Sequence, residues 1–201
     1  IHAALRLASS GPRILCDRLS HRSIHTALAL LDLRPLWLPR PWLSRAAVAG
    51  PVDPQAVDAA LCGAPDIETV CITSPTYYGV LSDISAIAAV CRRHGAKLVV
   101  DGAHGAHLFL LGENPYREAD VTVVSAHKTL RAPGQSALLL ASGYGMEELR
   151  EASALFATSS PSYPMMAALD VLREELCALG GQKPYRAAAR RVAALRRDYP
   201  G

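Results

Sequence analysis

The sequence predicts an α/β fold in which a mostly parallel sheet carries helices on both faces. Two observations support this: apolar runs of strand length alternate with stretches of helical periodicity, and glycine, proline and capping residues separate them. Strands that alternate with helices are joined by crossovers, which make neighbouring strands parallel. The 201 residues suit one domain, and a hydrophobic content of 50% excludes intrinsic disorder. We therefore expect a single domain over residues 1–201.

Capping and helix-breaking residues mark where the helices begin and end. Asp53 is a good N-cap, and Pro54 follows it at the first helical position. Either Ser82 or Asp83 begins the helix that Gly95 ends. Helices are predicted at 2–10, 24–31, 53–61, 82–94, 147–157, 163–179 and 184–197. Short apolar runs predict strands at 13–17, 35–38, 69–73, 97–101, 121–124 and 136–141.

Composition excludes several classes of function. A net charge of +3 is too small to indicate nucleic-acid binding, and no apolar run approaches the roughly 20 residues of a membrane span. The five cysteines are scattered without a CxxC pair, so we expect free, buried thiols in a reducing compartment. These features predict a cytoplasmic protein that binds neither nucleic acid nor membranes.

Polar residues follow four of the predicted strands. They are Ser20-His21, 74–76, 101–104 and 125–128. Ligands of open α/β sheets bind beyond the carboxyl ends of the strands, so these segments are the candidate site.

Lys128 and Asp101 are the residues of this set that indicate a particular chemistry. A lysine at a strand end is most simply an exposed side chain, but desolvation can also make it a nucleophile or Schiff-base former. Ser125 and His127 beside it suit a phosphate group. Asp101 ends a buried strand and needs a positive partner, which a protonated pyridine nitrogen would provide. This arrangement is the one expected of a pyridoxal phosphate site.

Other kinds of site have weaker support. The pairs His21/His25 and His104/His107 have usable metal-ligand spacings, but Gly102 and Gly105 disfavour a helix at His104, and no HExxH motif occurs. We expect these glycines to bring the backbone close to the cofactor, and we expect no metal site. His2 and His94 are predicted at the surface near helix ends, and His25 and His107 in structural contacts. The chain has no GxSxG, GxGxxG or Walker motif.

Five segments together resemble the bacterial Orn/Lys/Arg decarboxylases, which are pyridoxal phosphate enzymes of the aspartate aminotransferase fold. They are Asp-Arg-Leu-Ser-His-Arg-Ser at 17–23, Ile-Thr-Ser-Pro-Thr-Tyr-Tyr-Gly at 72–79, Asp-Gly-Ala-His-Gly-Ala-His at 101–107, Ser-Ala-His-Lys-Thr-Leu at 125–130 and Ser-Ser-Pro-Ser-Tyr at 159–163. They occur in the family's order, and the resemblance covers most of the chain. It implies the large domain of fold-type I pyridoxal phosphate enzymes.

The resemblance implies a role for each matching residue. Lys128 would hold the cofactor as a Schiff base, and Asp101 would bind its ring nitrogen. His21 would stack on one face of the ring, with Ala103 against the other.

It also assigns the groups around the rest of the cofactor. His104 would lie near the phenolic oxygen, and Ser125 and His127 would help bind the phosphate. Gly102 stands where family members have glutamate, a departure that leaves the ring-nitrogen partner unchanged.

The implied activity is decarboxylation of arginine, lysine or ornithine to the amine and carbon dioxide. Alternatives are another enzyme of this fold, such as an aminotransferase or acyl-transferring synthase, and an inactive structural fragment. The chain begins inside a helical pattern and ends abruptly at 199–201, so we expect a fragment that lacks the family's N-terminal phosphate loop and C-terminal small domain. The segment at 159–163, near the family's subunit boundary, implies a homodimer in the intact enzyme.

Overall fold

The computed structural model describes residues 1–112 and 114–198, so the predicted end at 199–201 lies outside the described residues. Its main sheet has six strands in the order β2-β1-β5-β6-β7-β8. The strands are β1 (Arg13–Asp17), β2 (Arg34–Leu38), β5 (Thr69–Thr73), β6 (Lys97–Asp101), β7 (Val121–Ser125) and β8 (Ala137–Ala141). All neighbouring strands are parallel except β7 and β8, which are antiparallel. The connection between β7 and β8 is too short for the crossover that parallel strands require. The predicted mostly parallel sheet is confirmed.

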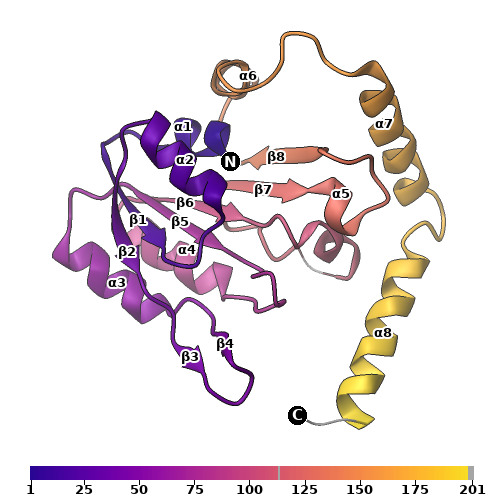
Figure 1. The fold of residues 1–201 in the computed structure, drawn as a ribbon, viewed down its shortest axis with the longest axis horizontal. Helices are drawn as coiled ribbons and strands as arrows, with labels where there is room; N and C mark the ends of the chain where they lie inside the picture. The colour runs from indigo at the N-terminus through magenta and orange to yellow at the C-terminus, as the bar shows by residue number, and fades with distance from the viewer. Residues whose placement is uncertain (113, 199–201) are drawn as a thin grey trace.

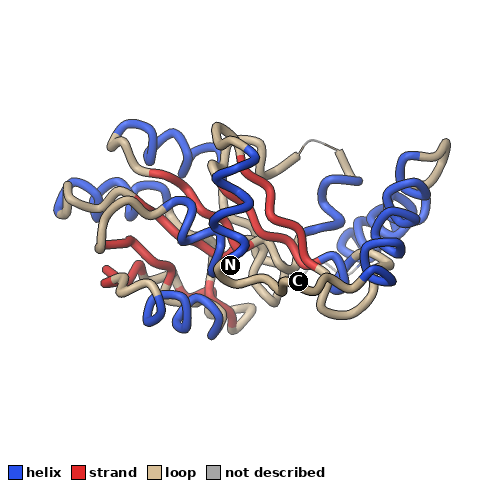
Figure 2. Tube along the Cα trace, turned by 90° about the horizontal axis from the view of Figure 1, so that it is seen from above, coloured by secondary structure: helices blue, strands red, loops and turns tan. Residues whose placement is uncertain are grey.

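Helices cover both faces of this sheet, as Figures 1 and 2 show. One face carries α1 (His2–Ala8), α2 (Arg22–Leu30) and α6 (Met146–Ala154); the other carries α3 (Pro54–Gly63), α4 (Ile84–Arg93) and the 3-10 helix η1 (Ala106–Leu110). Successive side chains of a strand point to opposite faces, so β1 places Ile14 in one core and Leu15 in the other. This two-sided burial explains why the strands are continuously apolar.

Capping residues and apolar runs in the sequence predicted most boundaries of the helices and strands to within a few residues. The predicted strands at 13–17, 69–73 and 97–101 are confirmed, and Asp53 caps α3 by accepting a hydrogen bond from Gln55 N at 2.9 Å. The helix predicted from 82 begins at Ile84 instead, with Asp83 as its N-cap. Ser82 is unavailable as a cap because its Oγ accepts from Val52 N at 2.9 Å.

Four short elements are missing from the sequence prediction. They are η1, the helix α5 (Ala126–Thr129), and the hairpin strands β3 (Trp42–Leu43) and β4 (Val48–Ala49). Elements of two to five residues are too short to show a recognisable periodicity. The prediction that all cysteines are buried is also wrong, because Cys62 and Cys177 are exposed. Both cysteines lie on helices, and the residue type alone does not predict whether a helical cysteine faces the core or the solvent.

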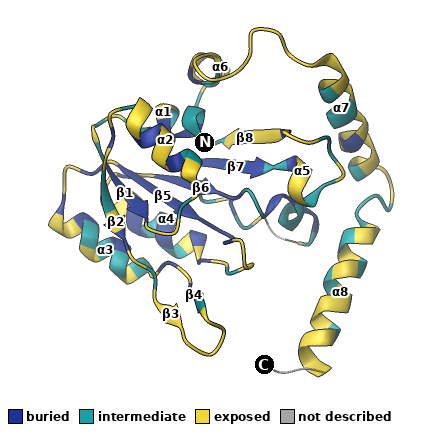
Figure 3. Cartoon of the chain, in the orientation of Figure 1, coloured by how far each residue is buried: buried dark blue, intermediate teal, exposed yellow. Residues whose placement is uncertain are grey.

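The last two helices extend away from the sheet. Helices α7 (Tyr163–Cys177) and α8 (Lys183–Asp198) form the arm on the right of Figure 1, and most of their surface is exposed in Figure 3. Leu172 is the one buried residue of α7, and the described α8 has none. No helix among the described residues is long and apolar enough to cross a membrane. The single-domain boundary at 1–201 stays a prediction.

Candidate active site

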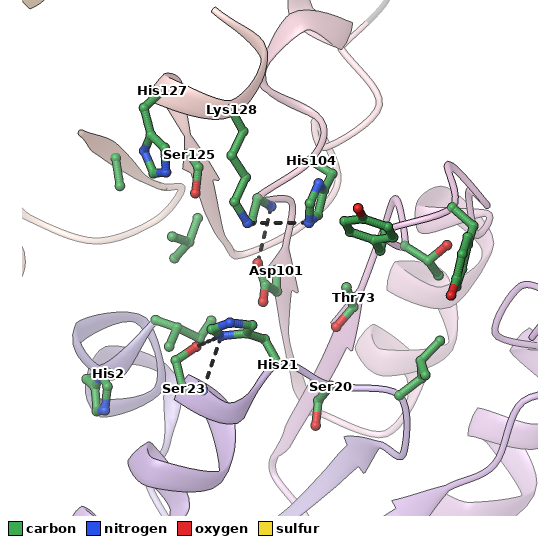
Figure 4. Close-up of a pocket in the computed structure, with 18 residues that line it drawn as sticks. His2, Ser20, His21, Ser23, Thr73, Asp101, His104, Ser125, His127 and Lys128 are labelled. Carbon is green, nitrogen blue, oxygen red and sulfur yellow. Dashed lines mark hydrogen bonds between the residues drawn. The ribbon is translucent and has the colours of Figure 1, made fainter. Parts of the chain in front are cut away.

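A cavity of about 570 Å³ opens beyond the carboxyl ends of β1, β5, β6 and β7. Each of the four polar segments that the sequence singled out contributes to its wall. The cavity also brings together every predicted site residue, as the close-up in Figure 4 shows: His21, Asp101, His104, Ser125, His127 and Lys128. A volume in this range fits a small organic ligand.

Lys128 enters the cavity from α5, directly after β7. Its Nζ donates a hydrogen bond to His104 Nε2 at 3.3 Å. Burial lowers the pKa of His104, and the positive charge of Lys128 lowers it further. The imidazole is therefore neutral near pH 7, which allows its Nε2 to accept this bond. The pair holds the lysine amine inside the cavity.

Asp101 lies at the base of the same cavity, between Lys128 and His21 in Figure 4. The residue is 6% exposed, and its Oδ1 accepts a hydrogen bond from Ala103 N at 3.2 Å. Within residues 1–112 and 114–198, no cationic side chain forms a salt bridge with it. A buried carboxylate with so few partners is the natural counterpart of a cationic group on a ligand.

His21 faces this carboxylate from the opposite wall. It is the N-cap of α2, and its Nδ1 accepts from Ser23 N at 3.2 Å and lies 2.8 Å from Ser23 Oγ. Because Nδ1 is an acceptor, the proton of the neutral ring sits on Nε2. The cap therefore fixes both the position and the tautomer of the ring.

Ser125 and His127 supply polar groups at the β7 side. The Ser125 side chain makes no capping bond to α5, so its hydroxyl is free for a ligand in the cavity. His127 Nδ1 donates to Ser136 O at 2.8 Å, which leaves Nε2 for the ligand. The Ser125 hydroxyl is a suitable donor to a phosphate oxygen, and the second ring nitrogen of His127 is a further polar group on the same side of the cavity.

The structure gives further detail on two expectations about neighbouring residues. A Cβ on Gly102 would come within 3.0 Å of Tyr116 Cζ, and one on Gly105 would overlap Tyr116 Oη. These glycines therefore make room for the buried Tyr116 ring, and the close approach of their backbone to a cofactor stays a prediction. His2, expected at the surface near a helix end, is the first residue of α1, is partly exposed and also lines the cavity.

Of the two histidines expected in structural contacts, His25 has them, whereas His107 Nδ1 is buried without a hydrogen-bond partner among the described residues. His25 Nε2 lies 3.3 Å from Ser20 Oγ, and the His25 ring packs at 5.3 Å from that of Trp37. Neither predicted histidine pair belongs to a metal-ligand group among the residues described here. The group that the structure does form is Asp58, Cys62 and His94, on α3 and after α4.

Sequence reasoning missed a buried ion pair next to the site. Arg40 Nε donates to both oxygens of Asp17, at 3.0 and 3.1 Å, and the two side chains are 2% and 0% exposed. Asp17 also accepts from Leu19 N at 2.9 Å and from Thr73 N at 3.1 Å. These bonds tie the segment that leads to His21 to the end of β5. The signal was available, because Asp17 ends a buried strand and so required a cation.

The chain matches a known family over almost its whole length. Residues 2–199 match the family described as "Orn/Lys/Arg decarboxylase, major domain". The chain belongs to the Orn/Lys/Arg decarboxylase family.

Relatives and solved structures agree with this membership. The chain is 37% identical over 178 residues to the uncharacterized protein YaaO of Bacillus subtilis, covering 84% of the chain and 37% of that protein. It is 27% identical to the arginine decarboxylase of Bacillus subtilis, covering 89% of the chain and 38% of that enzyme. The chain thus spans less than two fifths of these relatives' length.

A solved structure supports the fold. The constitutive lysine decarboxylase of E. coli superimposes with a TM-score of 0.79 at 22% identity, covering 98% of this chain and 30% of that one. The fold is that of the large domain of fold-type I pyridoxal phosphate enzymes, as the resemblance implied.

Proposed function

We propose that the intact protein uses pyridoxal 5'-phosphate to decarboxylate arginine, lysine or ornithine to the corresponding amine and carbon dioxide. The observation that carries this proposal is the buried Asp101 carboxylate, which lacks a cationic partner within the described chain and lies beneath the Lys128 amine. Family membership narrows the chemistry to that of a decarboxylase.

The residues of the cavity fit this cofactor. Asp101 offers a carboxylate to a ring nitrogen, and Lys128 offers an amine to an aldehyde carbon. Ala103 and Val123 line the same cavity with the apolar surface that a flat aromatic ring requires. Ser125 and His127 would hold the phosphate. Bound pyridoxal phosphate would supply an electron sink for the negative charge left on the α-carbon when carbon dioxide departs.

The chain's own groups then have separate tasks. Asp101 would hold a proton on the ring nitrogen of the bound cofactor, because its buried carboxylate favours a positive charge beside it. His104 accepts a hydrogen bond from Lys128 and so orients the amine. Lys128 returns a proton to the α-carbon before the product amine leaves. His21 would limit the movement of the bound ring and exclude water from the side of the cavity that it lines.

Asp101 is the one carboxylate among the described residues that line the cavity. A basic substrate side chain therefore finds no counter-ion there once Asp101 holds the ring nitrogen. The choice among the three substrates then depends on residues beyond this cavity wall.

The test is carbon dioxide release by the full-length protein from each of the three basic amino acids. We expect release from at least one of them, and none from a Lys128→Ala variant. If the protein catalyses transamination or acyl transfer and releases carbon dioxide from none of the three amino acids, the decarboxylase proposal is wrong and another reaction of this fold takes its place. No absorption in the visible after addition of pyridoxal phosphate would support an inactive structural role.

We also propose that the intact enzyme is a homodimer. The segment Ser159–Tyr163 is exposed and leads into α7, so it is accessible to a second subunit. Sedimentation of the full-length protein is the test, and a monomer with full activity at low concentration would contradict the proposal.

A further inference from the structure

We propose that Asp58, Cys62 and His94 form a Zn²⁺ site that joins α3 to the end of α4. Their ligand atoms, a carboxylate oxygen, a thiol sulfur and an imidazole nitrogen, all lie within 4.8 Å of one another. Thiolate, imidazole and carboxylate are the three side-chain ligands that Zn²⁺ uses in proteins. Three protein ligands leave the fourth tetrahedral position to water.

The distances are close to those of a tetrahedral site. Cys62 Sγ lies 4.0 Å from His94 Nε2, which lies 2.8 Å from Asp58 Oδ1. Zinc bonds of about 2.0–2.3 Å place neighbouring ligand atoms about 3.3–3.6 Å apart. For these two pairs, changes of roughly half an ångström would suffice, and the Asp58 oxygen and the Cys62 sulfur lie within 4.8 Å of each other, so rotation of the side chains can bring all three to these distances.

The scaffold beneath the cluster is rigid. Asp58 and Cys62 are four residues apart on α3, so they lie on one face of that helix, next to the C-cap residue His94 of α4. The two helices are anchored by buried side chains on their inner faces, including Leu61 and Cys91. The backbone N–H of His94 donates to Val90 O and Cys91 O, which fixes the base of the imidazole.

The competing interpretation is a surface ion pair. Arg93 Nη2 also donates to Asp58 Oδ1 at 3.0 Å, and the hydrogen bonds from His94 and Arg93 lower the pKa of Asp58. Both bonds use Oδ1. A metal ion would replace the His94 proton that this bond uses, so that Oδ1 and Nε2 would face the ion together, while Arg93 could keep its bond to the carboxylate. An ion pair does not account for the exposed Cys62 thiol, whose Sγ lies 4.0 Å from the same His94 Nε2.

Binding would change only protonation. Zn²⁺ would replace the thiol proton of Cys62 and any proton on His94 Nε2, and these protons would pass to solvent. No electron is transferred. The bound ion would stabilise the folded state by joining the two helices, in proportion to its affinity and concentration.

The site lies apart from the candidate active site. His94 precedes β6, whereas Asp101 ends it, and five residues of strand separate the two ends by about 13 Å. The proposal therefore does not depend on pyridoxal phosphate, and its failure would leave the proposed decarboxylase function unaffected.

The experiment is titration of the metal-free chain with Zn²⁺ in a calorimeter and with Co²⁺ in a spectrophotometer. We expect one ion to bind with a thiolate-to-cobalt charge-transfer band. Cys62→Ser should remove the band and weaken Zn²⁺ binding about tenfold or more. Loss of a residue that only hydrogen-bonds to a metal ligand already has an effect of this size, so loss of the ligand itself should have at least as large an effect. Cys177→Ser is the matched control, since Cys177 is also an exposed helical thiol, and it should bind as the wild type does.

A second measurement covers the case in which Cys62→Ser does not fold. In the wild type, Zn²⁺ should slow alkylation of Cys62 by iodoacetamide about tenfold or more and leave Cys177 unaffected. Equal alkylation of Cys62 with and without Zn²⁺, or a charge-transfer band that persists in Cys62→Ser, would overturn the proposal.

Discussion

Two buried carboxylates end strands on either side of β5, and their surroundings differ. Asp17 ends β1 and accepts hydrogen bonds from Arg40, Leu19 N and Thr73 N. Asp101 ends β6 and accepts one side-chain bond, from Ala103 N. Position in the sheet is nearly the same for both residues, so position alone does not distinguish a structural acid from one that serves a ligand.

The difference between these residues is whether the chain supplies its own cation. Transfer of a charge from water to the protein interior has an unfavourable free energy. Arg40 offsets this free energy for Asp17 through hydrogen bonds to both carboxylate oxygens. Asp101 has no such partner in the described part of the chain and faces a cavity lined by the Lys128 amine and four imidazoles. Mutations on the Asp17 side should therefore affect stability, and mutations on the cavity side should affect chemistry.

The largest expected effect is on the cavity side. Lys128→Ala should reduce decarboxylation by the full-length protein on the order of 10⁵-fold, as for loss of a covalent nucleophile, and change stability by less than about 0.5 kcal/mol. The measurements are carbon dioxide release and urea unfolding. A residual rate above about one hundredth of the wild type would contradict the assignment.

Borohydride reduction of the cofactor-loaded protein is a chemical test of whether Lys128 is the lysine that bonds to the cofactor. The chain has three lysines, and peptide mapping should find the label on Lys128 alone. Lys97 pairs with Asp120 at 3.1 Å at the opposite end of β6, and Lys183 begins α8. A label on either would place the cofactor elsewhere.

The largest effect on stability should come from the other carboxylate. Arg40→Ala leaves Asp17 buried without its cation and should lower the free energy of unfolding by about 3–5 kcal/mol. Urea unfolding of the chain tests this. As a control, Arg93→Ala removes an exposed ion pair and should change stability by about 1 kcal/mol or less. Equal effects of the two substitutions would remove the contrast.

Asp101→Asn and Asp17→Asn compare the two acids directly. Asp101→Asn should reduce turnover about 10²–10³-fold, because a neutral amide no longer holds the ring nitrogen protonated, and should destabilise the fold little. Asp17→Asn should destabilise by about 3 kcal/mol, because Arg40 is then left buried without its carboxylate. Unfolding curves and rates of both variants are needed, and a reversed pattern would refute the distinction.

The smallest expected effect is on the pH dependence of stability. Burial lowers the pKa of His104 and His107 in the folded chain, so the unfolded chain takes up protons first as the pH falls below about 6.5. Stability should therefore fall between pH 7.5 and 5.5, and the loss should be complete below the folded pKa values. Urea midpoints at these two pH values test the direction. The urea midpoint of a His104→Gln variant should depend less on pH. A wild-type midpoint that is unchanged or higher at pH 5.5 would contradict the prediction.

The sequence by itself determined the fold class, three strands to the residue, and the set of polar strand ends that meet at the cavity. These features depend on local patterns: apolar runs, caps, and the rule that parallel strands end at one edge. Lys128 and Asp101 could be selected in this way because each directly follows or ends an apolar strand.

Only the tertiary structure decided which groups meet across long separations in the chain. Arg40 reaches Asp17 over 23 residues, and His94 reaches Asp58 over 36. The space that Gly105 leaves is filled by Tyr116, and no local pattern encodes that contact. The physical reason is that burial and pairing depend on how elements pack, so one residue type in one local context becomes a structural anchor or a ligand site according to its neighbours in space.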